Sequence, residues 1–155
     1  MPMTQSTPVD DYRRQIERKL KLGNATEHTH RPALKSLIES LAPGVTAANE
    51  PKPVDCGAPD MVISRKAHHG PVTLGHIETR DVGVNLDGME RGKGANGEQF
   101  ICYRDGLPNW VLTDYLDFHC FVTGEKRLTA RIASPDGKGK LRAALRPRCA
   151  RMPDS

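Results

Sequence analysis

The chain has 155 residues, 37% of them hydrophobic and 27% charged, which is the size and composition of one globular domain with its own core. No run approaches the roughly 20 apolar residues of a membrane helix, and the start of the chain lacks a charged-then-apolar signal pattern, so we expect a cytoplasmic protein without a membrane partner. The net charge of +4 comes entirely from residues 134–155, and residues 1–133 are formally neutral, so bulk charge alone gives little support for nucleic-acid binding.

The first third of the sequence predicts a disordered start and two helices. Residues 1–9 are rich in Pro, Thr and Ser and are expected to be disordered. Apolar residues recur every four positions over 12–20 and predict a first helix. Residues 32–41 predict a second helix, with Pro32 in its first turn and a Pro-Gly stop after its end. Residues 43–58 contain several prolines and glycines and predict an extended connector.

After the connector the pattern changes to strands around one helix. The runs DMVIS (60–64) and VTLGHIE (72–78) predict a hairpin. GEQFICYRDG (97–106) predicts a helix, and three short strands follow it, at 109–115, 116–122 and 126–133. The element order is that of a mixed α/β fold, a single domain over residues 10–133 with helices flanking one central sheet. Residues 134–155 are expected to form a basic, weakly structured tail.

The cysteines exclude some kinds of site. Cys56, Cys102, Cys120 and Cys149 are scattered, with no Cys-x-x-Cys pair. This spacing favours buried free thiols over a disulfide framework or a zinc site.

Two acidic residues and an arginine stand at the ends of the predicted hairpin strands. Asp60 begins the first strand, and Glu78 and Arg80 lie two positions apart at the end of the second, so their side chains point to one face. Magnesium-dependent phosphodiester cleavage needs hard oxygen ligands with a cation beside them. The same pattern is also that of a solvated, salt-bridged strand end, because acid-x-base triplets are common. The spacing leaves both interpretations open.

Longer phrases of the sequence resemble a known family. The stretches NATEH, RPALK, NEP, GAPD and LTDYL, within a similarity over roughly residues 10–141, resemble the N-terminal domain of type ISP-like restriction-modification enzymes. These enzymes are often described as DNA methyltransferases or N-6 DNA methylases. The resemblance implies a restriction-endonuclease-like fold, as in the Mrr-like branch of the PD-(D/E)XK nuclease superfamily. In that family the domain precedes helicase, methyltransferase and DNA-recognition domains.

The resemblance also implies a metal centre. Asp60, preceded by Pro59, matches the first metal-binding aspartate of the motif, and Glu78 matches the second metal-binding acid. Glu27 matches an acid of the N-terminal helical segment that can support the metal. The implied cofactor is Mg²⁺ or Mn²⁺, the implied partner is double-stranded DNA, and the implied reaction is phosphodiester hydrolysis by metal-activated water. A helix-capping role for Glu27 remains an equal alternative.

The remaining implied site residues would contact DNA. Gln99 and Tyr103 match a Gln-x-x-x-Tyr element on the helix after the catalytic strand, which is expected near the DNA backbone or the metal-bound water. Their spacing of four also fits a surface hydrogen bond or a packing pair. Arg80 stands where the motif has a lysine. The resemblance therefore gives Asp60, Glu78, Arg80 and Gln99 as the catalytic set.

The arginine separates two functional hypotheses. A buried lysine can give up its proton, whereas an arginine stays protonated and presents a planar fork that holds phosphate. The first hypothesis is a magnesium-dependent endonuclease. The second is a catalytically inactive, DNA-contacting remnant of a truncated methyltransferase. The chain contains no glycine-rich SAM-binding motif, no Asn-Pro-Pro-Tyr-type motif and no Walker lysine loop, so neither hypothesis includes methylation or ATP hydrolysis.

Overall fold

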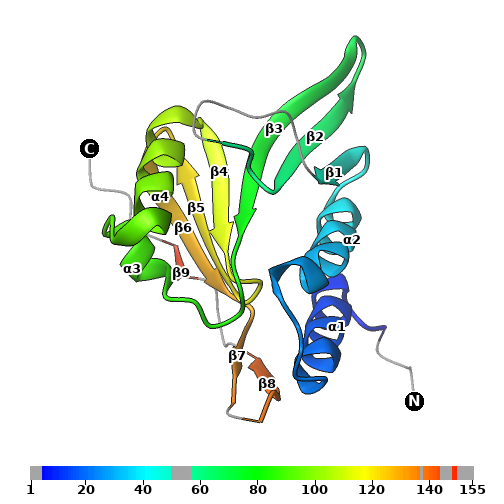
Figure 1. The fold of residues 1–155 in the computed structure, drawn as a ribbon. Helices are drawn as coiled ribbons and strands as arrows, with labels where there is room; N and C mark the ends of the chain where they lie inside the picture. Colours follow the sequence, from blue (N-terminus) through cyan, green and yellow to red (C-terminus); the bar gives the residue numbers. More distant parts are fainter. Residues whose placement is uncertain (1–4, 50–56, 137, 144–147, 150–155) are drawn as a thin grey trace.

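One mixed β-sheet forms the centre of the molecule in the computed structural model, which describes residues 5–49, 57–136, 138–143 and 148–149 (Figure 1). The strands in spatial order are β1 (Val45–Asn49), β2 (Met61–Ala67), β3 (Gly70–Thr79), β4 (Asn109–Thr113), β5 (Asp117–Val122), β6 (Glu125–Arg131) and β9 (Arg148–Cys149). β3 and β4 pair in parallel, and the other neighbours are antiparallel. The predicted mixed sheet is confirmed.

Helices cover both faces of this sheet (Figure 1). They are α1 (Pro8–Lys21), the 3-10 helix η1 (Glu27–His30), α2 (Arg31–Leu41), α3 (Leu86–Glu90) and α4 (Gly94–Gly106). α1 and α2 bury their apolar sides with Met61 and Ile77 in one core cluster. α3 and α4 enclose a second cluster with Leu112. Since neighbouring residues of a strand point to opposite faces, Ile77 faces α1 and α2 whereas Glu78 faces α3 and α4.

The first helix is anchored at both its start and its middle. The Thr7 hydroxyl accepts a hydrogen bond from the Asp10 backbone N–H at 3.1 Å, and the Thr7 backbone N–H donates to Asp10 Oδ2 at 3.3 Å. This capping box satisfies amides that the helix leaves free. Further along, the buried Tyr12 hydroxyl donates to the Tyr115 carbonyl oxygen at 2.6 Å. That bond ties the helical layer to the turn that follows β4.

The cluster under α4 is aromatic. The Trp110 ring stacks on Phe121 with centroids 4.8 Å apart and planes 19° apart, and Phe100 and Tyr103 of α4 pack against Trp110 edgewise or tilted. Aromatic pairs of this kind add to the free energy gained by burying their area. These ring contacts fix α4 over β4 and β5 and thereby fix the distance between the polar residues of α4 and the sheet.

Three segments differ from the sequence-based expectation. The first is the start of the chain, expected to be disordered over residues 1–9, where α1 begins at Pro8 because Thr7 caps it. β1 stands within the predicted connector 43–58, where its short Val-Thr-Ala-Ala run gives little strand signal, and it forms because it pairs with β2 and buries Ala47. In the predicted weak tail, β7 (Ala133–Pro135) and β8 (Leu141–Ala143) form a hairpin, and Leu141 is buried in the core against α1. A single apolar residue among basic ones carries no periodic signal.

Some expectations fall outside the described residues. They are those for residues 1–4, 50–56, 137, 144–147 and 150–155. The expectation of free thiols is correct for Cys120 and wrong for Cys102, which is disulfide-bonded. Scattered spacing in sequence does not prevent two cysteines from meeting in the fold. None of the described helices is long and apolar enough to cross a membrane.

Candidate functional site

Asp60 and Glu78 lie side by side at the same end of two neighbouring strands. Met61 pairs with Ile77, so Asp60, directly before β2, lies opposite Glu78 on β3. The Asp60 backbone N–H donates to Glu78 Oε2 at 3.2 Å. The Thr79 backbone N–H and hydroxyl both donate to Asp60 Oδ2, at 2.7 and 2.8 Å. Backbone donors therefore fix both carboxylates in position.

Two guanidinium groups neutralise these carboxylates. Arg80 Nη1 donates to Glu78 Oε1 at 2.6 Å and to the Thr79 carbonyl oxygen at 2.7 Å. Arg31, the first residue of α2, makes an ion pair with Asp60 Oδ1 through its Nη2. All four side chains are mostly buried, so these charge-assisted bonds act at low dielectric. The sequence analysis missed Arg31, because only the fold brings residues 29 positions apart together.

A short hydrogen-bond chain connects the carboxylates to α4. Arg80 Nη2 donates to Gln99 Oε1 at 2.8 Å, and Gln99 Nε2 donates to the Tyr103 hydroxyl oxygen at 3.1 Å. Burial, followed by the nearby charges of Glu78 and Asp60, raises the pKa of Tyr103 to about 12. Tyr103 is therefore protonated at neutral pH. Five of the six residues that the sequence analysis associated with the site lie in one connected group.

The electrostatics of the group suit a hard cation. Burial and the Asp60 carboxylate raise the pKa of Glu78, and the hydrogen bond and charge of Arg80 oppose this shift. Two carboxylates crowded in a desolvated site are stabilised by any positive charge placed between them. Carboxylate and carbonyl oxygens are the donors that Mg²⁺ and Mn²⁺ prefer. The donor set of Asp60, Glu78 and the Thr79 carbonyl thus fits such an ion, and Arg80 Nη1 already contacts two of these groups.

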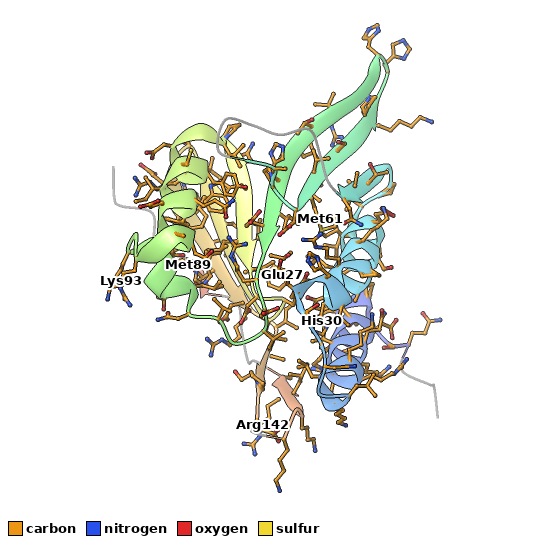
Figure 2. The ribbon with its side chains drawn as sticks, in the orientation of Figure 1. Glu27, His30, Met61, Met89, Lys93 and Arg142 are labelled. Carbon is orange, nitrogen blue, oxygen red and sulfur yellow. The ribbon has the colours of Figure 1, made fainter. Side chains whose placement is uncertain are left out.

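Glu27 lies near the group but outside its hydrogen bonds. It stands at the start of η1, on the side that faces the sheet (Figure 2). Its backbone N–H donates to Asp81 Oδ1 at 2.6 Å, and its carbonyl oxygen accepts a bond from the Tyr115 hydroxyl. Its carboxylate lies 3.8 Å from His28 Nε2. In the described residues Arg31, one turn further on, is the residue of this segment that contacts Asp60. Support of a metal by Glu27 stays a prediction.

A second group of possible metal ligands lies on the same face of the sheet. Oxygen or nitrogen atoms of Asp87, Glu90 and His119 all lie within 4.8 Å of one another. Glu90 already contacts His119 Nδ1 through one oxygen and accepts from Lys126 Nζ at 2.7 Å through the other. This ion-pair network accounts for the buried imidazole without a metal. No local sequence pattern predicts this group, because its members come from α3, β5 and β6.

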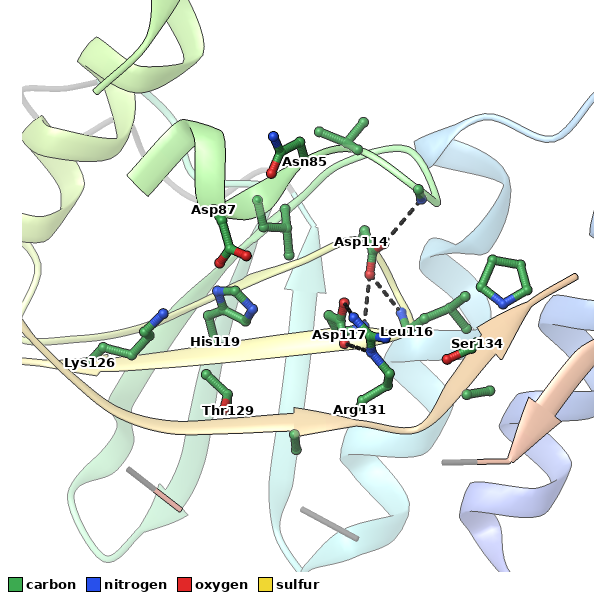
Figure 3. A pocket seen from close by; sticks show the side chains of 16 residues that line it. Asn85, Asp87, Asp114, Leu116, Asp117, His119, Lys126, Thr129, Arg131 and Ser134 are labelled. Atoms are coloured by element: carbon green, nitrogen blue, oxygen red, sulfur yellow. Dashed lines mark hydrogen bonds and ion pairs between the residues drawn. The ribbon is translucent and has the colours of Figure 1, made fainter. Parts of the chain in front are cut away.

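Two members of this second group, Asp87 and His119, line a cavity. The cavity has a volume of about 1040 Å³, and Figure 3 shows Asp87, His119 and Lys126 on one side of it and Asp117 with Arg131 on the other. Arg131 makes two hydrogen bonds to the Asp117 carboxylate, at 2.6 and 2.8 Å. None of the six sequence-predicted site residues lines this cavity. The candidate centre at Asp60 and Glu78 is therefore a separate feature.

Comparisons with known proteins address the fold. The sequence matches no protein-family profile and no curated protein. The structure resembles a chain of a solved structure described as the cryo-electron-microscopy structure of a DrdV–DNA complex, with a TM-score of 0.60 and 19% sequence identity. The similarity covers 80% of this chain and only 12% of that one. At this identity the likeness concerns the fold, and it agrees with the predicted restriction-endonuclease-like arrangement of a mixed sheet flanked by helices.

Proposed function

We propose that this chain is the nuclease domain of a larger DNA restriction-modification protein and that it hydrolyses DNA phosphodiester bonds with a divalent metal. The observation that carries the proposal is the mostly buried, hydrogen-bonded pair of Asp60 and Glu78 at adjacent strand ends, which Arg80 links to Gln99 of α4. The sequence resemblance to type ISP-like enzymes and the fold shared with a DNA-bound protein point the same way.

In this proposal Asp60 and Glu78 hold Mg²⁺ or Mn²⁺, with Glu27 in a supporting position. When bound, such an ion supplies an activated water and neutralises charge on the phosphate. The chain itself contributes orientation and charge. Thr79 fixes Asp60 Oδ2 through two hydrogen bonds, and Asp60 Oδ1 contacts Arg31. The two carboxylates of Asp60 and Glu78 are therefore held close together by paired strands and not by a flexible loop.

Arg80 and Gln99 are proposed to contact the scissile phosphate, with Tyr103 behind them near the DNA backbone. A guanidinium offers a fork of donors that matches phosphate oxygens. The bond between Arg80 and Gln99 holds that fork on the side of α4. Since arginine stays protonated, Arg80 positions and neutralises the phosphate and does not remove a proton from water.

A second candidate function is a DNA-contacting module without cleavage. It is favoured by the position of Arg80, whose Nη1 lies against Glu78 Oε1 and the Thr79 carbonyl oxygen, where a cation would bind. Arg31 likewise contacts Asp60. With both acids paired to internal cations, the group is charge-balanced without a metal. A metal must compete with these arginines.

Cleavage of supercoiled plasmid in Mg²⁺ or Mn²⁺ tests the proposal. We expect the native chain to nick plasmid and Asp60→Ala to lose at least ~100-fold in rate, because a metal ligand supplies several kcal/mol of charge stabilisation in the transition state. Arg80→Lys should bind metal more tightly, since lysine lacks the fork that spans Glu78 and Thr79. Arg104→Lys, an exchange at a surface residue of α4, is the matched control.

The outcomes separate the two candidates. Metal binding by calorimetry without cleavage in the native chain, and cleavage only in Arg80→Lys, would establish the second candidate for this sequence. Absence of metal binding in the native chain, Arg80→Lys and Arg80→Ala alike would contradict the metal centre altogether.

A further inference from the structure

The outer half of the β2–β3 hairpin extends beyond β4 as a projecting arm of the sheet (Figure 1). β3 pairs with β4 only from His76 to Thr79, and its residues 70–75 pair only with β2. On the other side, β1 pairs with β2 as far as Arg65, and the Lys66 backbone N–H donates to the Gly44 carbonyl oxygen at 2.9 Å, so β2 has a neighbour up to Lys66. At the position where β3 separates from β4, the two backbones lie so close that a Cβ on Gly75 would be 2.8 Å from the Asn109 carbonyl oxygen.

The charge of this arm is of one sign. Between Asp60 and Glu78 the sequence contains no acidic residue, whereas Arg65, Lys66, His68 and His69 follow almost in succession. All four are exposed. Within the described residues, no ion pair is formed by Arg65 or Lys66, although most other basic side chains of the domain have an acidic neighbour. Within the described part of the chain, this projecting element thus carries basic side chains and no acidic residue between Asp60 and Glu78.

The base of the arm is the candidate centre itself. Asp60 and Glu78 stand at the inner ends of the same two strands, and the turn at Gly70 lies eight residues outward from Glu78. At roughly 3.3 Å per residue the arm reaches about 26 Å from the carboxylates. A duplex rises 3.4 Å for each base pair, so this is about eight base pairs.

We propose that the β2–β3 hairpin is a DNA-binding arm whose Arg65 and Lys66 contact phosphates of the duplex flanking the bond held at Asp60 and Glu78. The proposal rests on DNA being the substrate of the centre. It adds the direction of the bound duplex, which runs outward along the hairpin and passes the edge of the sheet where β1 ends. A two-stranded ribbon fits a DNA groove, and phosphate contacts fix its register without reading sequence.

Pairing with another protein strand is the competing use of such an arm. Exposed strand edges attract other strands, and Val72 and Leu74 are exposed apolar residues on β3. Several features oppose it. Pro71 lacks an N–H to donate, and a β-bulge between Ile63 and Ser64 twists the ribbon. With the unpaired basic charge, these features favour DNA.

The test is the salt dependence of duplex binding by the whole chain. Binding of a labelled duplex of ~30 base pairs is followed by anisotropy between about 50 and 200 mM salt, without added metal. Arg65→Ala/Lys66→Ala should weaken binding on the order of tenfold and lower the slope of log K against log salt by about 1.8, since each lost phosphate contact removes about 0.9. Arg14→Ala/Lys21→Ala removes two exposed charges from α1, away from the arm, and should keep the native slope.

The results distinguish the arm from the proposed function. If the native chain binds duplex and the Arg65/Lys66 double variant binds with the native affinity and slope, the arm proposal is wrong while DNA remains the substrate. If the native chain binds no duplex at any salt, both proposals fail. Arg65 and Lys66 are exposed, so we expect the double variant to keep its fold. A circular-dichroism melt of each variant checks this and excludes unfolding as the cause of weaker binding.

Discussion

At the scale of single residues, the two carboxylates of the candidate centre are paired with Arg31 and Arg80. A metal ion that binds there has to compete with these arginines. Arg80 donates to Glu78, to the Thr79 carbonyl and to Gln99, so one side chain organises most of the group. Breaking a buried ion pair leaves an uncompensated charge and is costly. This explains why the acids are stable next to each other without a metal, and why the nature of residue 80 decides how easily a metal enters.

Glu78 should make the stability of the chain depend on pH. Its pKa is raised in the folded state, so near and above the ordinary value of 4.5 the folded chain keeps a proton that the unfolded chain has released. Stability from this group is therefore present at low pH and is lost as pH rises through the raised pKa. Glu78→Gln should remove that loss, so its free energy of unfolding should gain on the native chain from pH 4 to pH 7.

Urea unfolding at a series of pH values measures this difference, without added metal. Glu98→Gln, at an exposed site of α4, should give a profile parallel to the native one. A free energy of unfolding of Glu78→Gln that falls relative to that of the native chain as pH rises would contradict the assignment.

At the scale of elements, α4 shows which site features sequence reasoning can reach. Gln99 and Tyr103 are four residues apart, so a helix alone places them on one face, and the expected helix over 97–106 is present. The helix begins at Gly94, earlier than the apolar pattern predicts, and this start depends on the contact between Gly97 and Gly92. Gly97 packs against the backbone of Gly92, where a Cβ would lie within 2.8 Å of the Gly92 Cα and carbonyl oxygen.

Gly97→Ala should therefore destabilise the domain although alanine is the better helix former. Helix propensity favours the alanine by about 1 kcal/mol, whereas an added methyl in a packed site costs about 1–3 kcal/mol, and here the neighbour is rigid backbone. We expect a net loss of about 1–2 kcal/mol in denaturant unfolding. Asn96→Ala, one residue earlier and exposed, should be neutral or slightly stabilising. An equal gain in both variants would show that α4 starts differently.

At the scale of the whole molecule, segments far apart in sequence close the core. Leu141 is 6% exposed and packs in the cluster of α1 and α2. Its backbone N–H donates to Glu17 Oε2 at 3.0 Å, across 124 positions. The segment predicted to be a basic, weakly structured tail thus packs against α1. Its many charged residues gave no periodic apolar pattern from which this packing could be predicted.

Leu141→Ala should destabilise the domain by about 2–3 kcal/mol, the usual cost of truncating a buried leucine. Arg142→Ala, exposed on the same strand, should change stability by less than about 0.5 kcal/mol. Thermal and urea unfolding measure both. Equal, small effects would mean that β8 is not part of the cooperative unit.

The sequence by itself determined the features that depend on local spacing. Strand alternation put Glu78 and Arg80 on one face, the hairpin put Asp60 at the same end, and helical spacing joined Gln99 to Tyr103. Only the tertiary structure decided that Arg31 contacts Asp60, that Arg80 lies against the oxygens a metal would use, and that the β2–β3 hairpin continues beyond its neighbours. The physical reason is range: periodicity constrains neighbours within a turn or a strand pair, whereas burial and charge pairing depend on which distant segments the core brings together.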